Sequence, residues 1–325
     1  MTTAKLDATH GGQEPIDAVF TWVDDRFPGY AESLRRYGRT EADLNPNRTR
    51  DNLDLIKYNF RALTQFAPWI RQVYLVSCSP QVPVWLAPSP RLRIVHHDVF
   101  VDRNVLPTFN SFAIQSFLHR LPGLSRRFVM FDDDVFLAAP VSPAHFLDGD
   151  GKLRVFKRFG HTPCASLRHS KEISPWNAAL AHTNYLLNEV YGRVRRPSFT
   201  HAPLFVDCDL WEEMIHNWPE DFALTRSSRF RAQYNVVPDY LYPNFLLATG
   251  RGTTVSVLRT YRETYYHGVD NFLPWAQCGL FGIDLLRPRS VCLNDGFGDD
   301  PNPSVVSLVR RLLERKFPTK SPFET

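Results

Sequence analysis

Long apolar runs, paired cysteines and internal repeats are all missing from this chain of 325 residues. No apolar stretch is long enough to span a membrane, and residues 1–14 have polar residues where a signal peptide needs an apolar centre. We therefore expect a disordered N-terminus and a cytoplasmic protein. A disulfide framework and a zinc cluster are excluded because the five cysteines lie far apart and form no C-x-x-C pair. They are Cys78, Cys164, Cys208, Cys278 and Cys292.

A strong charge of either sign is also absent. The 38 basic residues stand against 34 acidic ones, which gives a net charge of +4 and a pI of about 8.8. This near balance gives little support to nucleic-acid binding, although a small positive excess suits phosphorylated substrates. A composition with 43% hydrophobic and 22% charged residues is typical of a soluble globular protein. Because no low-complexity linker divides the chain, we expect one domain over residues 15–325.

Apolar strands and amphipathic helices alternate along the chain as far as Phe131. The pattern predicts strands over 16–23, 72–76, 92–95 and 128–131, with helices after Asp51, an expected N-cap, and over 114–121. This order favours a mostly parallel sheet with helices on its faces. Beyond Leu153 the pattern is looser, and it predicts helices over 176–190, 210–217 and 240–248 and after Pro303.

Three adjacent carboxylates, Asp132, Asp133 and Asp134, directly follow the strand predicted over 128–131. Ligands bind at the carboxyl end of such strands, and carboxylates this close together are costly unless a cation or a proton shares them. The apolar pattern resumes at once over 135–137. We therefore interpret the triplet as a site for a divalent metal that grips a diphosphate, and not as a solvated turn.

Other polar clusters lie beside apolar segments, at 21–25, 48–52, 107–111 and 292–299. Together with the Asp triplet they resemble the conserved regions of the stealth family of capsular polysaccharide phosphotransferases. The catalytic subunit of the lysosomal-enzyme GlcNAc-1-phosphotransferase belongs to the same family. The resemblance runs from Ile16 to Phe323. Its first block is 16–24, its second 50–86, its third 106–136 with 201–203 and 229–231, and its fourth 293–324.

This resemblance implies a glycosyltransferase-A-like α/β fold, in which a mostly parallel sheet is flanked by helices and further helical segments are added. The implied reaction is metal-dependent transfer of a hexose or N-acetylhexosamine 1-phosphate from a UDP-sugar to a sugar hydroxyl, with release of UMP. The acceptor is an oligosaccharide or polysaccharide of the cell surface. Such a role implies peripheral association with polysaccharide enzymes at the inner face of the membrane. Two alternatives stay open: a conventional glycosyltransferase that releases UDP, and a non-catalytic carbohydrate-binding relative.

Roles for single residues follow from the same resemblance. Asp134, Asp295 and Asn294 would hold Mg²⁺ or Mn²⁺ through oxygen atoms. Arg231 and Arg61 would clamp phosphate, since a guanidinium binds two phosphoryl oxygens at once. His201 would remove the acceptor proton or donate to a phosphoryl oxygen, with a structural His as the rival interpretation. The catalytic set is thus Asp134, His201 and Arg231, and the expected substrate-binding residues are Thr21, Trp22, Asp24, Arg50, Asp51, Arg61, Asn110, Ser111 and Asp133.

Ordinary structural roles are alternatives to several of these assignments. Trp22 is equally expected in the core, and Asn110 and Ser111 are equally expected as helix N-caps. The chain also departs from the family pattern. Residues 77–81 stand where the family has Thr-Asp-Gly-Gln, Phe112 and Gln115 replace a His and a Glu, and Asp132 replaces an Asn. These departures bear on sugar and acceptor specificity more than on the reaction.

Overall fold

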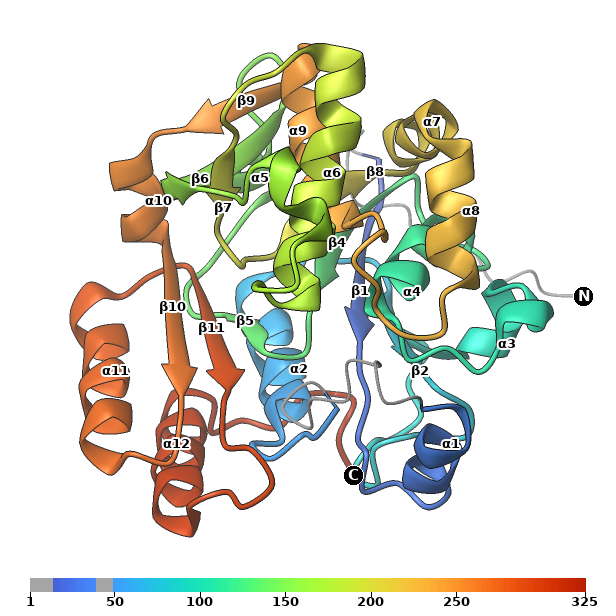
Figure 1. Ribbon diagram of the computed structural model, residues 1–325. Coiled ribbons are helices and arrows are strands. Elements are labelled where there is room, and N and C mark those ends of the chain that lie inside the picture. The colour runs from blue at the N-terminus through green and yellow to red at the C-terminus, as the bar shows by residue number, and fades with distance from the viewer. Residues whose placement is uncertain (1–13, 39–48) are drawn as a thin grey trace, which may run out of the picture.

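The computed structural model describes residues 14–38 and 49–325 and shows three β-sheets with helices packed around them (Figure 1). The segment expected to be disordered, 1–14, lies outside the described residues apart from Glu14. That residues 15–325 form one domain stays a prediction, and one cluster of buried apolar side chains extends from Ile16 to Phe323. Within the described ranges, no helix has both the length and the apolar character needed to cross a membrane.

The central sheet has the strand order β3-β2-β1-β4-β8. Strands β1 to β4 pair in parallel, and β8 pairs antiparallel with β4. All of β2 is buried, and so is nearly all of β1 and β4, because helices cover both faces of a parallel sheet. The predicted α/β fold with a mostly parallel sheet is confirmed. The bounds are β1 (Ile16–Thr21), β2 (Val73–Ser77), β3 (Leu92–His96), β4 (Arg127–Phe131) and β8 (Leu204–Asp207).

The strand order of the central sheet changes direction at β1. Strands β2 and β3 lie on one side of β1, whereas β4 lies on its other side. In open parallel sheets a switch of this kind leaves a crevice at the carboxyl ends of the two strands, where ligands bind. Trp22 follows β1 and Asp132 follows β4, so both residues lie at this crevice.

The Asp triplet connects the central sheet to a second sheet. Strand β5 (Val135–Leu137) begins directly after Asp134 and pairs antiparallel with β11 (Ser290–Asp295). In turn β11 pairs in parallel with β10 (Thr264–Val269). The three acids are therefore held between two buried strands, as the sequence predicted.

A third sheet consists of β6 (Leu153–His161), β7 (Pro197–Phe199) and β9 (Gly252–Val255). Strand β6 pairs in parallel with β9 and antiparallel with β7. The sequence did not predict these strands. Along β6 only Leu153 and Val155 are buried, and basic side chains fill much of the rest, so the alternation that marks a half-buried strand is weak.

Helices surround the three sheets, and α2 packs against β5 directly beside the Asp triplet. The described helices are α1 (Tyr30–Tyr37), α2 (Leu55–Phe66), α3 (His97–Phe100), α4 (Ser111–Phe117), α5 (Pro143–Phe146), α6 (Pro175–Tyr191), α7 (Cys208–Asn217), α8 (Pro219–Ser227), α9 (Pro238–Ala248), α10 (Val257–Glu263), α11 (Leu273–Leu286) and α12 (Pro303–Lys316), with short 3-10 helices at Arg103–Val105, Leu118–Arg120 and Ala165–His169.

Most predicted helices are present, and α12 begins at Pro303 with Asn302 as its N-cap, as expected. The predicted start of α2 is wrong. This helix begins at Leu55, and its cap position is Asp54, whose backbone is left-handed with φ 54°. The Asp51 carboxylate still accepts a hydrogen bond from the Leu55 amide at 3.1 Å, so it stabilises the helix start from outside.

Arg61 does not line the crevice, so its predicted role as a phosphate clamp is wrong. Its guanidinium lies inside the protein and forms a two-pronged ion pair with Glu324, with a shortest distance of 2.7 Å. It also donates to Glu314 and to the carbonyl of Phe317. These contacts attach α2 to α12 and to the last residues of the chain, and they use the donors that a phosphate would need.

We predict that Arg61→Met destabilises the fold by about 3 to 5 kcal/mol, because Glu324 would remain buried without its cation. Urea unfolding measures the loss. Arg61→Met combined with Glu324→Gln should recover much of the stability, and UDP should bind both folded variants as it binds the wild type. A variant that kept its stability but lost UDP affinity would restore Arg61 as a phosphate ligand.

Candidate active site

A cavity of about 810 Å³ occupies the crevice between β1 and β4. Segments far apart in the sequence meet in its wall. Trp22 comes from the end of β1, the Asp triplet from the end of β4, His201 from the segment before β8, and Asp295 from the end of β11. This convergence makes the cavity the candidate active site.

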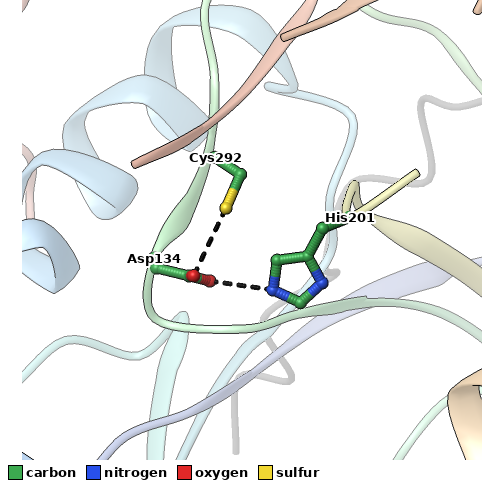
Figure 2. Close-up of side chains that lie close together, drawn as sticks. All are labelled: Asp134, His201 and Cys292. Carbon is green, nitrogen blue, oxygen red and sulfur yellow. Dashed lines mark hydrogen bonds and ion pairs between the residues drawn. The ribbon is translucent and has the colours of Figure 1, made fainter. Parts of the chain in front are cut away.

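His201 and Asp134 form the charged centre of the cavity (Figure 2). His201 Nε2 lies 3.1 Å from Asp134 Oδ1 and 3.5 Å from Asp132 Oδ2. Burial alone would lower the pKa of His201, but the charge of Asp134 and its hydrogen bond raise it to about 10. Burial would likewise raise the pKa of Asp134, yet His201 and the donors Asn294 and Cys292 lower it to about 2. The pair is therefore an imidazolium and a carboxylate at neutral pH.

Strand β11 supplies the other two partners of Asp134. Cys292 Sγ lies 3.3 Å and Asn294 Nδ2 3.0 Å from Asp134 Oδ2. Residues two apart on a strand point to the same face, which explains why Cys292 and Asn294 reach one carboxylate. Asp295 points to the opposite face, where its carboxylate accepts a hydrogen bond of 2.6 Å from Asn52. The structure therefore brings Asn294, but not Asp295, to Asp134.

Asp134, His201 and Cys292 each offer one potential metal-binding atom, and these atoms lie within 4.8 Å of one another. In this arrangement both His201 and Cys292 are protonated. Asp134 raises the pKa of His201 to about 10, and burial raises the pKa of the Cys292 thiol well above its usual value. Metal ligands of these two types must be deprotonated. A mixed site with nitrogen and sulfur ligands therefore fits poorly, and the carboxylates are the better candidates.

Carboxylates are in excess in the cavity wall, which contains three arginines and two histidines. Burial and neighbouring acids raise the pKa of Asp132 and Asp133. Burial also raises the pKa of Asp51 and of Asp239 to about 6. This accumulation of oxygen donors with too little positive charge fits a divalent cation such as Mg²⁺ or Mn²⁺. The six carboxylates belong to Asp51, Asp132, Asp133, Asp134, Asp239 and Asp295.

Arg231 lines the cavity and is fixed by Ser111 and two aromatic rings. Its Nη2 donates to Ser111 Oγ at 2.6 Å, and its guanidinium carbon lies 4.9 Å from the ring centre of Phe112 and 5.4 Å from that of Trp176. Phe112, one of the departures from the family pattern, thus supports the arginine. Asn110 is fully buried and absent from the cavity wall; it caps α4 and donates to Phe230 O and Asn235 Oδ1. Its predicted contact with substrate is therefore wrong.

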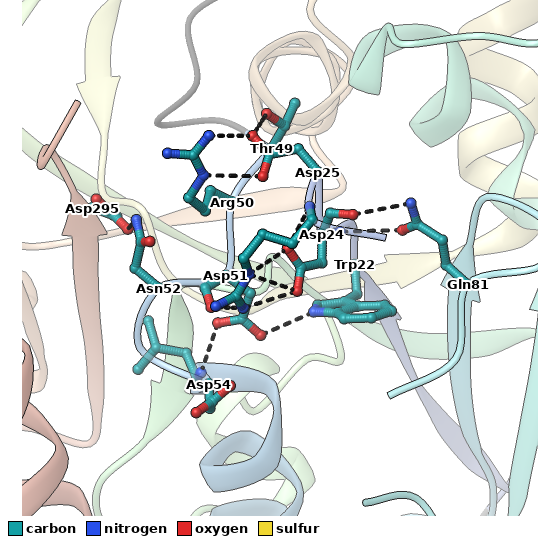
Figure 3. A network of polar contacts seen from close by, with 12 residues as sticks. Trp22, Asp24, Asp25, Thr49, Arg50, Asp51, Asn52, Asp54, Gln81 and Asp295 are labelled. Carbon is teal, nitrogen blue, oxygen red and sulfur yellow. Dashed lines mark hydrogen bonds and ion pairs between the residues drawn. The ribbon is translucent and has the colours of Figure 1, made fainter. Parts of the chain in front are cut away.

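The other end of the cavity is a network of polar contacts around Asp51 (Figure 3). Trp22 is only 6% exposed, and its indole Nε1 donates to Asp51 Oδ2 at 3.0 Å. Arg50 lines the cavity and pairs with Asp25 at 3.0 Å. Trp22 is thus both a core residue and part of the wall, which reconciles the two interpretations of it.

Asp24 lies outside the cavity wall, so the structure does not bring it to the other predicted substrate-binding residues. Its carboxylate pairs with Arg26 at 2.9 Å, and its backbone exchanges two hydrogen bonds with the Gln81 side chain. Gln81 belongs to the segment that departs from the family pattern, where it supports the end of β1. The predicted residues that do line the cavity are Thr21, Trp22, Arg50, Asp51, Ser111, Asp133, Asp134, His201, Arg231, Asn294 and Asp295.

Several residues of the wall were not predicted from the sequence. Asp239 lies in the first turn of α9, and its Oδ1 is buried without a hydrogen-bond partner in the part of the chain that the structure describes. Gln115 lies against Asp132 and stabilises its charge. Cys292 lies outside the wall but contacts Asp134, and it had one usable signal, its spacing of two from Asn294 on a strand. For the others no local signal exists, because their roles depend on the packing of distant segments. They include Trp176 and Tyr266.

Models of three conserved regions of Stealth proteins match this chain: region 2 over 48–155, region 3 over 200–248 and region 4 over 283–325. Region 2 includes 106–136, which we had assigned to a third block, so that division is wrong. His201 and Arg231 lie in region 3, and Asn294 and Asp295 in region 4. The chain belongs to the stealth family.

Its relatives include proteins named exopolysaccharide phosphotransferase. One from Streptomyces coelicolor is 34% identical over 317 residues, which are 95% of this chain and 52% of that protein. CpsY from Mycobacterium tuberculosis is 32% identical over 317 residues, which are 95% of this chain and 58% of that protein. The chain thus spans about half the length of the curated relatives that it matches.

Solved glycosyltransferases resemble the chain more distantly. The galactosyltransferase LgtC is 12% identical with a TM-score of 0.42, and 92% of this chain and 96% of LgtC are aligned. The bifunctional glycosyltransferase WbbM is 10% identical with a TM-score of 0.47, and 97% of this chain and 53% of WbbM are aligned. Since these scores are low, the α/β fold class rests on the sheets of this chain.

Gln115 and Asp132 provide a test of the departures from the family pattern, in which Glu and Asn occupy these two positions. We predict that the amide and the carboxylate have exchanged places, so Gln115→Glu, which adds a second buried acid beside Asp132, should destabilise the protein, and Asp132→Asn in the same chain should recover the loss. A double-mutant cycle by urea unfolding should give a favourable coupling of about 1 kcal/mol or more. Strictly additive effects would show that the two side chains do not act as a pair.

Proposed function

We propose that this chain transfers a sugar 1-phosphate from a UDP-sugar to a hydroxyl of an oligosaccharide or polysaccharide and releases UMP. The names of its relatives support phosphotransfer in exopolysaccharide synthesis. One observation about the cavity carries the proposal. An imidazolium and an arginine, His201 and Arg231, lie beside a set of acids at the switch point of the sheet.

The proposed bond changes take place at the phosphorus that carries the sugar. The acceptor oxygen forms a bond to this phosphorus, and the bond to the bridging oxygen of the UMP group breaks. UMP leaves with that oxygen, and the sugar keeps its bond to phosphate. Attack at carbon 1 of the sugar would instead release UDP, as in a conventional glycosyltransferase.

His201 and Arg231 are proposed to stabilise the charge that develops on the phosphoryl oxygens. Arg231 is pre-oriented because Ser111 and two rings hold its guanidinium. His201 is a hydrogen-bond donor, since its proton is held by Asp134. It is therefore a poor acceptor of the hydroxyl proton. Asp132 and Asp239, both with raised pKa, are the proposed acceptors of that proton.

The proposed metal would be held by Asp134 and Asn294, with Asp133 and Asp295 in the same cavity wall. A divalent cation supplies charge neutralisation for a diphosphate, which the acid-rich wall cannot provide by itself. Residues Trp22, Arg50 and Asp51 are proposed to meet the nucleotide at the other end of the cavity. Assembly of the acceptor chain at the inner face of a membrane stays part of the proposal.

The identity of the nucleotide product tests the reaction. We expect the purified chain, given UDP-sugars, an oligosaccharide acceptor and Mg²⁺, to yield UMP and a phosphodiester visible by ³¹P NMR. Arg231→Lys keeps the charge but loses the two-pronged geometry, so kcat should fall by about 10²-fold. Release of UDP alone would identify a glycosyltransferase, and sugar binding without turnover would identify a non-catalytic relative.

Metal titration tests the ligands. Chelation should abolish transfer, and Asp134→Asn should raise the Mg²⁺ concentration needed for half-maximal activity by about tenfold or more. Asp295→Asn should do the same if Asp295 shares the ion. Asp150→Asn, in an exposed turn, is the matched control. An Asp295→Asn variant with an unchanged Mg²⁺ requirement and weaker UDP binding would assign Asp295 to the nucleotide end, where Asn52 holds it.

A further inference from the structure

Positive charge is concentrated in one stretch of the chain, residues 152–200. This stretch contains nine Lys and Arg against two Asp and Glu, a net charge of +7, whereas the whole chain carries only +4. The remainder of the chain is therefore net acidic. In space the stretch runs from β6 through α6 to β7, the green to yellow-green part of Figure 1. The conserved regions matched by the family models end at 155 and resume at 200.

The basic residues of this stretch have no acidic partners. None of the nine forms an ion pair with a carboxylate of residues 14–38 or 49–325, although eight of them are at least partly exposed and Arg196 alone among them is buried. Elsewhere, arginines such as Arg71 and Arg251 are paired with acids. Positive charges on one stretch of chain repel one another where no acid offsets them, so an anionic ligand would stabilise them. The nine are Lys152, Arg154, Lys157, Arg158, Arg168, Lys171, Arg193, Arg195 and Arg196.

Arg158 connects this basic surface to the catalytic cavity. It lies in the cavity wall together with Thr162, Ser198 and Thr200 of the same stretch. Its guanidinium carbon is 5.6 Å from the ring centre of Tyr266, which is 45% exposed. A cation beside an exposed aromatic ring suits a sugar that carries a negative charge, because the ring packs on the sugar and the cation binds the charge.

We propose that residues 152–200 form the acceptor surface, and that the acceptor is an anionic glycan with phosphodiester groups in its backbone. The inference rests on the proposed function. Each transfer of a sugar 1-phosphate adds one phosphodiester, so a chain that grows by this reaction carries a negative charge near the hydroxyl that reacts next. Arg158 binds the phosphodiester closest to the cavity, and Arg193 and Arg195 bind the chain farther out.

The donor diphosphate does not account for this surface. His201 and Arg231 already offer two cations near the Asp triplet, and the proposed nucleotide contacts lie around Trp22 and Asp51. The basic stretch contributes a different wall, made of β6, β7 and the start of α6. Donor and acceptor therefore meet the cavity from two separate parts of the chain.

The test is binding of the whole chain to poly(glycerol phosphate), a phosphodiester polymer, with neutral dextran and phosphatidylglycerol vesicles as comparisons. We expect binding to the polymer, no binding to dextran, and weakening by added salt. Arg158→Gln should weaken binding by about tenfold, and Arg193→Gln with Arg195→Gln by a similar factor. Arg287→Gln with Arg311→Gln, exposed arginines outside the stretch, is the matched control and should bind as the wild type does.

Three results would overturn the acceptor surface: unaltered polymer binding in the Arg158→Gln and Arg193→Gln with Arg195→Gln variants, equal weakening in the control variant, or tighter binding to vesicles than to the polymer. The affinity for UDP, measured by calorimetry, should stay unchanged in all variants, and a loss of UDP affinity in Arg158→Gln would assign this arginine to the donor. The product assay separates the two proposals. UMP release together with unaltered polymer binding in the variants removes only the acceptor surface, whereas UDP release removes the proposed function itself.

Discussion

The ion pair between Asp134 and His201 is the contact on which the arrangement of the cavity depends. It joins the end of β4 to the segment before β8, and through Cys292 and Asn294 it also holds β11. A carboxylate this deeply placed among other acids needs a neighbouring positive charge, and the imidazolium provides it within the chain. Removal of that charge would leave Asp132, Asp133 and Asp134 to repel one another at the point where two sheets meet.

Sequence reasoning succeeded where a signal is local. The buried runs of β1, β2 and β4 and the acids directly after β4 are visible in short windows, and their placement at one crevice follows from the parallel order of the strands. It failed where a role depends on a distant partner. Arg61 and Glu324 are 263 positions apart, and no sequence feature near Arg61 indicates that it pairs with a buried carboxylate.

Asn110 and Asp239 show the same limit of sequence reasoning in two ways, one as a predicted site residue that is structural and the other as a site residue that was not predicted. Asn110 has the residue type and the position of a ligand, yet it is buried and holds together the segment that carries Arg231. Asp239 stands at the start of a helix, where an acid is ordinary, yet it lines the cavity and its Oδ1 has no hydrogen-bond partner among the described residues. A polar side chain beside an apolar run has either a structural or a chemical role, and only tertiary packing distinguishes them.

Each of the three sheets contributes to a different part of the cavity. The central sheet supplies Trp22 at one end of the cavity and the first of the acids, and the sheet of β5, β10 and β11 fixes Asp134 from the other side. The third sheet leads into Thr200 and His201, which directly follow β7, and its own strands form a separate part of the wall. Because its basic residues form no ion pairs with the acids around Asp134, they can change without disturbing the Asp134 and His201 pair. Under the proposed function, such a separation would allow one phosphotransfer centre to serve different acceptors.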